Sequence, residues 1–283
     1  MGDAVYMGSK HATTDATGRE ELDEWERPTV FYNKYVKWTV YATVAGFVLW
    51  SAWGLRVPPE RLVIGVEAGG GMVADMFPPD FGPMARSRIW TGIIDTLAMS
   101  IVATVAGIIL SVPVAFMAAR NYAPRPIYYV GTGLIILSRT FHPLILAIVF
   151  VKAVGIGPLA GVITLACVTV GFFAKLLSEE IEDIDRTQYD AILSTGASPL
   201  RAILYGIVPQ IYPRFIGLSV YRWDINFRAS TIIGIVGAGG IGSTLMASFR
   251  RFQFDFSLAI LLTILVLVML GEVLSLHVRR RIR

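Results

Sequence analysis

Long uncharged stretches alternate with shorter polar segments along this chain of 283 residues. The clearest uncharged stretches cover residues 38–55, 96–119, 153–174 and 256–271. About 20 apolar residues in a helix cross the hydrocarbon core of a bilayer, and most of these stretches approach or exceed that length. The pattern therefore predicts an all-α polytopic membrane protein.

Six membrane helices are predicted when the less regular stretches are included. We place them at residues 38–55, 91–119, 127–151, 158–177, from about 209 onwards, and 257–276. The third contains the sequence "SRTFHP". Pro143 should bend or break this helix, because proline has no amide hydrogen to donate.

The polar segments define the organisation of the chain. Residues 1–37 are expected to form a polar, acidic cytoplasmic tail, and the Gly- and Pro-rich residues 56–90 an external loop. Residues 91–277 would form the membrane core, which contains a polar segment at 186–209, and residues 278–283 are a basic end. The chain is thus one membrane core with polar additions at its start, middle and end.

The composition agrees with this class and excludes others. Hydrophobic residues make up 54% of the chain and charged residues 16%, against about 25% in an average soluble domain. The formal net charge is +4, but the basic residues are spread over the loops and form no basic-aromatic patch. This distribution argues against nucleic-acid binding.

Lys and Arg are unevenly divided between alternate loops. With six crossings and both termini in the cytoplasm, 14 of them lie inside and seven outside. Because cytoplasmic loops are enriched in Lys and Arg, the count predicts this orientation. It also places residues 178–203 in the cytoplasm.

This cytoplasmic segment has the pattern of a helix–turn–helix. A short amphipathic helix can extend to Ser194, and Gly196 permits a turn because it has no Cβ. Ser198 and Pro199 suit the N-cap and first position of a second helix. Such a projection can dock on a partner and transmit rigid-body motion, whereas an ordinary amphipathic loop is the alternative.

The same segment resembles a motif of the permeases of binding-protein-dependent ABC importers. Their Glu-Ala-Ala, Gly and Ile-x-Leu-Pro spacing is matched by Asp190-Ala191-Ile192, Gly196 and Val208-Pro209. This chain departs from the motif at four positions: Asp190 replaces Glu, Ile192 replaces the second Ala, Gly206 stands at the Ile position and Val208 replaces Leu. The sequences "FPPDF", "VGIGPLAGV", "SEEIEDID", "STGASPLRAILYGIVPQIYPRF" and "YRWDINFRASTIIGIVGAGGIG" extend the likeness over about residues 76–245 and are similar to phosphonate-type ABC importer permeases.

The resemblance implies the fold and the partners. The fold would be a type I ABC importer permease core with one extra N-terminal helix, in the inner or plasma membrane of a bacterium. The chain would form a homodimer, bind two cytoplasmic ABC ATPase subunits, which would hold the ATP and Mg²⁺, and receive its substrate from an external binding protein. The residues expected to couple it to the ATPases are Asp190, Ala191, Thr195, Gly196, Ala197, Ser198 and Pro209.

Charged residues inside predicted membrane helices are costly and usually face a cavity or a partner. Asp224 and Arg228 are four residues apart, so they can pair on one helix face, and Arg222 is expected to face a pathway for an anion. A purely structural ion pair is the alternative. The proposed substrate-pathway residues are Arg139, His142, Arg222, Asp224, Asn226, Arg228, Ser230 and Thr231.

The sequence "GAGGIG" contains a spacing that occurs in dinucleotide-binding proteins. That motif requires a strand and a soluble βαβ unit, which the hydrophobic pattern does not provide. Gly237, Gly239, Gly240 and Gly242 are therefore interpreted as gate or helix-packing glycines.

Other chemistries lack their signatures. We find no Gly-x-x-x-x-Gly-Lys-[Ser/Thr] loop, no Gly-x-Ser-Gly nucleophile and no metal-ligand spacing of His, Cys and carboxylates, so no catalytic residue, metal or cofactor is assigned to this chain. The predicted function is import of a phosphonate, phosphite or phosphate, and the sequence does not distinguish among them. A related importer for another small solute is the alternative, followed by an intramembrane enzyme.

Overall fold

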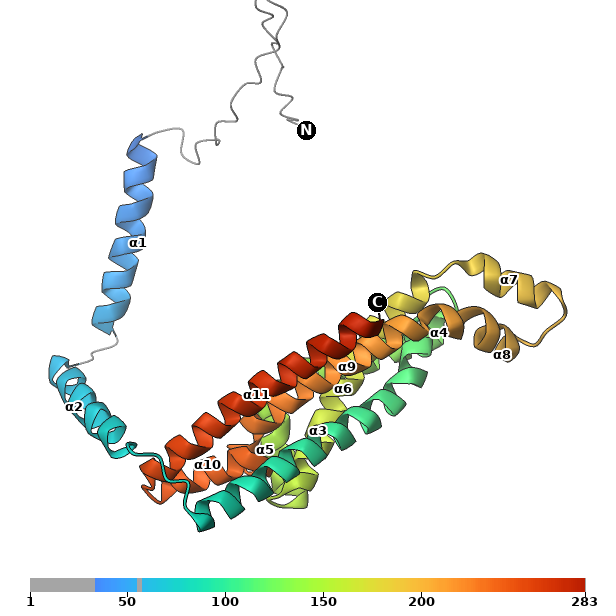
Figure 1. Ribbon diagram of the computed structural model, residues 1–283. Coiled ribbons are helices and arrows are strands. Elements are labelled where there is room, and N and C mark those ends of the chain that lie inside the picture. Colours follow the sequence, from blue (N-terminus) through green and yellow to red (C-terminus); the bar gives the residue numbers. More distant parts are fainter. Residues whose placement is uncertain (1–33, 55–57, 283) are drawn as a thin grey trace, which may run out of the picture. The chain divides into compact units, whose positions relative to one another are not determined.

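The computed structural model describes residues 34–54 and 58–282, and every regular element in that part is helical (Figure 1). The chain divides into two compact units, Met1–Val66 and Glu67–Arg283. The predicted polar tail falls mostly on residues 1–33, outside the described residues. In order, the elements are α1 (Lys34–Gly54), α2 (Pro59–Asp75), α3 (Pro83–Ala118), α4 (Arg125–Thr140), α5 (Pro143–Val154), α6 (Pro158–Glu182), α7 (Arg186–Ser194), α8 (Pro199–Ala202), the π-helix η1 (Ile203–Ile207), α9 (Val208–Gly234), α10 (Gly240–Arg250) and α11 (Phe254–Ile282).

Three of the described helices, α3, α6 and α11, are long and apolar enough to cross a membrane. A fourth candidate is the pair α4 and α5, which is bent by 88° at its break. The other two predicted spans, α1 and α9, have 21 and 27 residues, or about 31 and 40 Å of helix, but both are less apolar than α3, α6 and α11. In α9 the reason is its buried polar residues, among them Arg222 and Asp224.

The segment predicted as a Gly- and Pro-rich loop is partly helical, and in this respect the prediction is wrong. Residues Pro59–Asp75 form α2, and α3 begins at Pro83, eight residues before its predicted start. Both helices carry proline in their first turn, where the missing amide hydrogen has no intrahelical partner to lose. The glycines of "EAGGG" lower helix propensity by only about 1 kcal/mol each, which does not end the helix.

The helix break predicted at "SRTFHP" is confirmed. α4 ends at Thr140, and α5 begins at Pro143. His142 is the N-cap of α5, where its Nδ1 accepts a hydrogen bond from the amide of Leu144 at 3.3 Å. The histidine therefore satisfies one of the free amides that the proline break creates.

α3 and α6 form the centre of the second unit and run parallel. Gly107 lies against Thr169, and the backbone amide of Arg120, just beyond α3, donates to the Glu182 carboxylate at the end of α6 at 2.6 Å. A Cβ on Gly107 would lie 2.5 Å from that of Thr169, so only glycine allows this approach. Small residues commonly bring membrane helices together in this way, because lipid supplies no hydrophobic drive for association.

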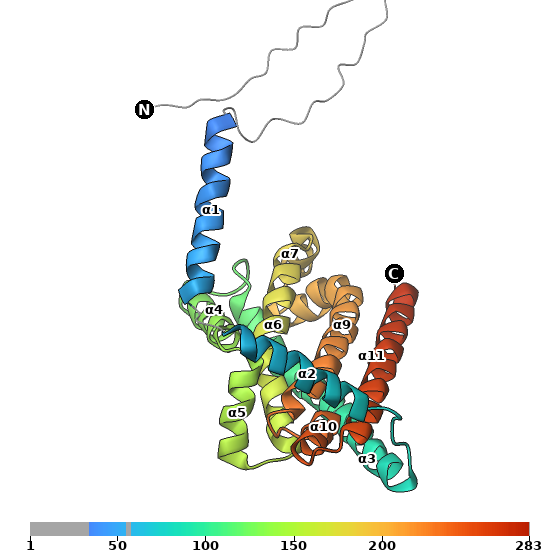
Figure 2. The same ribbon diagram turned by 90° about the vertical axis from the view of Figure 1, so that its left-hand side faces the viewer.

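α9 runs antiparallel to α3 and α6, and two separate clusters of buried apolar residues lie along the three helices. At one end Phe173, Leu177 and Ile181 of α6 pack with Ile207 and Ile211. Further along, Met99, Leu165 and Ile233 form a second cluster. α7 and α8 extend beyond the first end of this bundle, and α10 closes the opposite end (Figures 1 and 2).

Replacement of Gly107 by alanine should destabilise the protein by about 1–3 kcal/mol, because the new methyl group overlaps Thr169. Gly133→Ala in α4 is the matched control, since nothing lies within 4 Å of its Cβ position and alanine favours helix. Thermal unfolding in detergent should show a lower midpoint for Gly107→Ala alone. Equal midpoints for the two variants would contradict the close packing of α3 on α6.

Candidate functional site

A buried polar network joins α9 to both central helices. The Nε of Arg222 donates to the Thr169 hydroxyl at 3.0 Å, and the Asn226 amide donates to the same hydroxyl at 2.9 Å and to that of Thr104 at 2.8 Å. Arg222 is only 3% exposed, and its guanidinium lies 4.9 Å from the ring centre of Phe172. Since Thr104 belongs to α3 and Thr169 to α6, these hydrogen bonds join α3, α6 and α9 at one level of the bundle.

The predicted pair of Asp224 and Arg228 is present. Arg228 Nη2 and Asp224 Oδ2 are 2.8 Å apart across one helical turn. The two side chains differ in environment, because the Asp224 side chain is 4% exposed and that of Arg228 is 42% exposed. Within the described part of the chain, Asp224 Oδ1, Asn226 Oδ1 and Trp223 Nε1 are buried without a hydrogen-bond partner.

The two arginines Arg222 and Arg228 of α9 lie in different environments. Arg222, predicted to face the pathway, is buried between α9 and α6, whereas the Arg228 side chain is partly exposed. The cause is the threonine and phenylalanine on the facing surface of α6, which provide an acceptor and an aromatic ring for Arg222. An anion could reach Arg222 only if α6 and α9 separated.

The remaining proposed pathway residues fall into two groups. Ser230 and Thr231 are buried, and their hydroxyls donate to the backbone oxygens of Phe227 and Arg228 within α9. Arg139 lies at the end of α4 and lines a cavity of about 550 Å³, while His142 caps α5. The structure therefore brings the α9 residues together and places Arg139 on a different surface.

The predicted helix–turn–helix is formed by α7, a glycine turn and α8. Gly196 has a φ of 82°, which L-residues rarely adopt, and Pro199 occupies the first turn of α8 behind Ser198 as N-cap. Most of the residues predicted to contact an ATPase are exposed, and Ala197 is partly buried. The exposed ones are Asp190, Ala191, Thr195, Gly196, Ser198 and Pro209.

Asp185 starts α7 in the manner of a helix cap. Its carboxylate accepts a hydrogen bond from the amide of Thr187 at 2.9 Å. This bond holds the pKa of the Asp185 carboxyl below its usual value, because it favours the charged form. The charged carboxylate thus satisfies one of the free amides at the start of α7.

Two contacts that the sequence pattern did not reveal attach α7 to the membrane helices. The side chain of Gln210 in α9 accepts a hydrogen bond from the backbone amide of Asp185 and donates one to the backbone oxygen of Asp185, each at 3.2 Å. The ring of Tyr122, in the α3–α4 loop, lies edge-on to Tyr189 of α7 with 5.1 Å between centres. Burial raises the pKa of the Tyr122 hydroxyl above its usual value, because it disfavours the charged form.

Gly206 allows α7 to lie on η1. A Cβ at this position would lie 3.0 Å from the Cα of Tyr189 and 3.3 Å from Ile192 Cδ1. The glycine that departs from the importer motif therefore serves close packing of α7. The π-helix leads directly into Pro209 and Pro213, which donate no backbone hydrogen bond to the preceding turn.

The glycines of "GAGGIG" form the tight connection from α9 to α10. Gly237, Gly239 and Gly240 have φ values of 94°, 84° and 72°. The oxygen of Gly237 accepts from the amide of Gly157 at 3.0 Å, and a Cβ on Gly242 would overlap the backbone oxygen of Thr231. Within the described chain, the arrangement explains these glycines by turn geometry and close packing.

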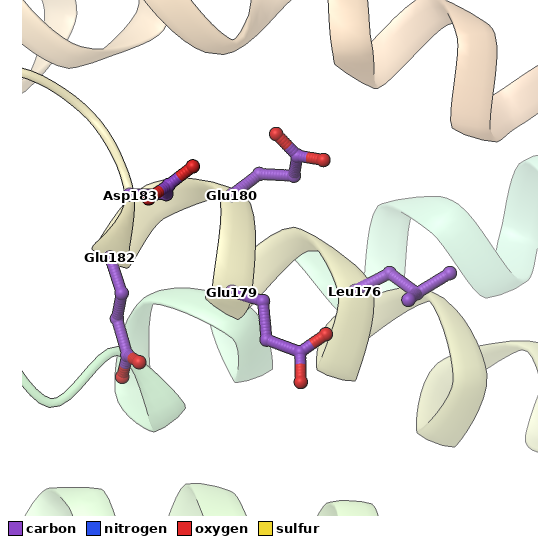
Figure 3. Close-up of a pocket in the computed structure, with 5 residues that line it drawn as sticks. All are labelled: Leu176, Glu179, Glu180, Glu182 and Asp183. Atoms are coloured by element: carbon purple, nitrogen blue, oxygen red, sulfur yellow. The ribbon is translucent and has the colours of Figure 1, made fainter. Parts of the chain in front are cut away.

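Four carboxylates gather around a pocket of about 400 Å³ at the end of α6, but they do not converge (Figure 3). The figure shows the side chains of Glu179, Glu180, Glu182 and Asp183 pointing in different directions. Glu179 pairs with Lys175 at 3.1 Å and Glu180 with Arg214 at 3.4 Å. Among the described residues, no group of His, Cys, Asp and Glu is arranged to hold a metal ion.

The unequal burial of the Asp224–Arg228 pair predicts unequal effects of its two halves. Arg228→Gln leaves a buried carboxylate unpaired and should approach the roughly 3–5 kcal/mol found for broken buried pairs. Asp224→Asn leaves an arginine that can turn to solvent and should cost less. The double variant should recover much of the stability that Arg228→Gln loses.

Thermal unfolding of the purified protein measures all three variants. Arg222→Gln should also be destabilising, because it removes the contacts with Thr169 and Phe172. If Asp224→Asn proved more destabilising than Arg228→Gln, Arg228 rather than Asp224 would be the buried member of the pair, contrary to the structure.

Comparison with known proteins places this site in a family. The model of the binding-protein-dependent transport system inner membrane component matches residues 107–283. The phosphite transport system permease protein of Stutzerimonas stutzeri is 41% identical over 238 residues, which are 83% of this chain and 85% of that protein. The phosphate-import permease protein of Mycolicibacterium smegmatis is 39% identical over 244 residues, which are 86% of this chain but 45% of that protein.

A solved structure supports the fold. A chain of the MetNI methionine ABC transporter in an inward-facing conformation aligns with a TM-score of 0.62 at 20% identity, covering 72% of this chain and 100% of that chain. The type I ABC importer permease fold predicted from the sequence is thereby confirmed. The chain belongs to the family of inner membrane components of binding-protein-dependent transport systems.

Proposed function

We propose that this chain is the permease subunit of an ATP-driven importer for a phosphorus oxyanion. The observation that carries the proposal is the match to the phosphite transport system permease protein along 83% of the chain. The phosphate-import permease protein supports the same substrate class. Phosphite, phosphate and phosphonates share charged oxygens on a tetrahedral phosphorus, so one permease fold can serve all of them.

The exposed helix–turn–helix is the proposed contact with the ATPases. Two cytoplasmic ATPase subunits would bind and hydrolyse ATP and push on the coupling residues between Asp190 and Pro209. Through Gln210 the push would reach α9, and through Tyr122 it would reach the α3–α4 loop. A small rigid-body shift of α7 would thus be shared between two membrane elements, as alternating exposure of a site requires.

The assembly is also proposed rather than observed. Two copies of this chain would form the pathway, and an external binding protein would deliver the substrate. Both termini and α7 would lie on the cytoplasmic side of a bacterial inner or plasma membrane, as the distribution of Lys and Arg predicts. The apolar residues exposed on α3 and α11, such as Ile109 and Leu265, are suited to lipid or to the second copy.

Uptake by proteoliposomes containing the permease, its ATPases and the binding protein tests the function. Phosphite, phosphate and methylphosphonate should be taken up with ATP inside, and methionine and sulfate should not. Gly196→Val should reduce uptake and substrate-stimulated ATP hydrolysis at least tenfold, because valine is strained at a φ of 82°.

Gly133→Val is the matched control, since it introduces the same side chain in α4 where nothing lies within 4 Å. It should transport normally. Normal transport by Gly196→Val would remove the turn from the coupling mechanism, and uptake of methionine instead of the phosphorus compounds would contradict the substrate class.

The orientation is tested by cysteine labelling in a variant in which Cys167, the single native cysteine, is replaced by serine. Thr195→Cys should react with a membrane-impermeant maleimide only in inside-out vesicles. Phe81→Cys, at an exposed position before α3, should react in whole spheroplasts. Labelling of Thr195→Cys from outside would contradict the orientation and the proposed contact with the ATPases together.

A further inference from the structure

A cavity of about 550 Å³ lies between α4 and α6, and Arg120 of the α3–α4 loop also lines it. Three cationic side chains line it, Arg139 from α4, Lys175 from α6 and Arg120 from the loop, against one carboxylate, Glu182. Its volume lies within the range of small-molecule sites. The cavity is therefore large enough for a small anion and carries an excess of positive charge.

The carboxylates nearby leave the two arginines free. Glu182 already accepts the backbone amide of Arg120 at 2.6 Å, and Glu179, which pairs with Lys175, does not line the cavity. Among the described residues, no carboxylate forms an ion pair with the guanidinium of Arg139 or Arg120. A guanidinium presents a fork of donors that matches two oxygens of a phosphorus oxyanion.

The position of Arg139 is fixed by the contact of α4 with α6. The hydroxyl of Ser138 donates to the Cys167 oxygen at 2.6 Å and accepts from the Gly171 amide at 3.1 Å, so it bridges one turn of α6. The side chain of Arg139 lies over Gly171, where an added Cβ would be 3.0 Å from its Cγ. Lys175 follows one turn further along α6, on the way to Arg120.

The remaining walls suit a substrate that is part ion and part organic group. Thr132 offers a hydroxyl, and Ile135 and Ile136 offer apolar surface. The hydroxyls of Thr140 and Ser178 donate to backbone oxygens of their own helices. A bare phosphate would leave much of the volume to water. A phosphonate would place its oxygens at the cations and its carbon substituent against the isoleucines.

We propose that this cavity is a transit subsite for a phosphorus oxyanion, in which Arg139 and Lys175 bind the anion and Arg120 receives it at the end of the bundle that carries α7. The inference rests on the proposed function, because it takes the substrate class from there. It gives the exposed Arg139 a substrate contact that the buried Arg222 cannot make in this conformation.

Phosphorus NMR tests binding directly. The full-length chain in a maltoside detergent, which contains no phosphorus, should broaden the signal of inorganic phosphate in a saturable way, and methylphosphonate should compete. Arg139→Gln combined with Lys175→Gln should weaken this binding at least tenfold, and Arg139→Lys should retain part of it. Arg125→Gln is the matched control, because Arg125 is exposed in the first turn of the same helix and does not line the cavity.

Each outcome decides the proposal. Equal broadening by the double variant and by Arg125→Gln would overturn it. A lipid in the cavity would also overturn it. In that case the wild-type protein would not broaden the phosphate signal, and native mass spectrometry would show bound phosphatidylglycerol that the double variant loses. Sulfate that competes as well as methylphosphonate would show a general anion site and would also overturn it.

Transport separates this proposal from the proposed function. If the wild-type complex takes up no phosphorus oxyanion, the proposed function fails whatever the cavity binds. If the wild type transports and Arg139→Gln is as fast as Arg125→Gln, the cavity proposal alone fails. The expected result is uptake at least tenfold slower for Arg139→Gln, with the ATPase subunits still co-purifying in normal amount.

Discussion

The hydroxyl of Thr169 is the point on which the arrangement of the central helices depends. It accepts from Arg222 and Asn226 of α9 and donates to the Leu165 oxygen in its own helix, while Gly107 of α3 lies directly against its side chain. A buried hydrogen-bond network in a low-dielectric environment is strong when all its members are satisfied and costly when one is lost. The three helices are therefore held in one register at this level.

The hydrogen bonds at Thr169 also limit the movement of α9 relative to α3 and α6. Buried side chains that change partners allow a bundle to have two discrete arrangements rather than a continuous range. Along α9 the Arg222 and Asn226 nitrogens that bond Thr169 and Thr104 alternate with buried atoms that have no partner in the described chain, Asp224 Oδ1, Asn226 Oδ1 and Trp223 Nε1. Those atoms are the groups whose hydrogen bonding would improve if α9 moved or met another copy of the chain.

The proposed coupling segment, α7, is in direct contact with α9, the helix whose side chains bond Thr169. α7 is capped by Asp185, lies on η1 over Gly206 and is bonded to α9 by Gln210, so a displacement of α7 is passed to the helix that carries Arg222. The contact between Tyr122 and Tyr189 passes it to the α3–α4 loop as well. That loop also supplies Arg120 to the cavity between α4 and α6, so it contacts both α7 and the proposed transit subsite.

The sequence by itself determined the features that depend on neighbouring residues. The lengths of the apolar stretches established the all-α membrane class, Pro143 established the break between α4 and α5, and the i, i+4 spacing established the pair of Asp224 and Arg228. The sequence did not predict α2, because a Gly- and Pro-rich composition is typical of a loop, whereas these glycines only weaken the helix. Only the tertiary structure decided that Arg222 is buried and that Arg139 shares a cavity with Lys175 and Arg120. Arg222 bonds Thr169, which is 53 residues away in the sequence, and Asn226 bonds Thr104, which is 122 residues away. No local pattern of charge or hydrophobicity encodes which helix faces bring such distant residues together.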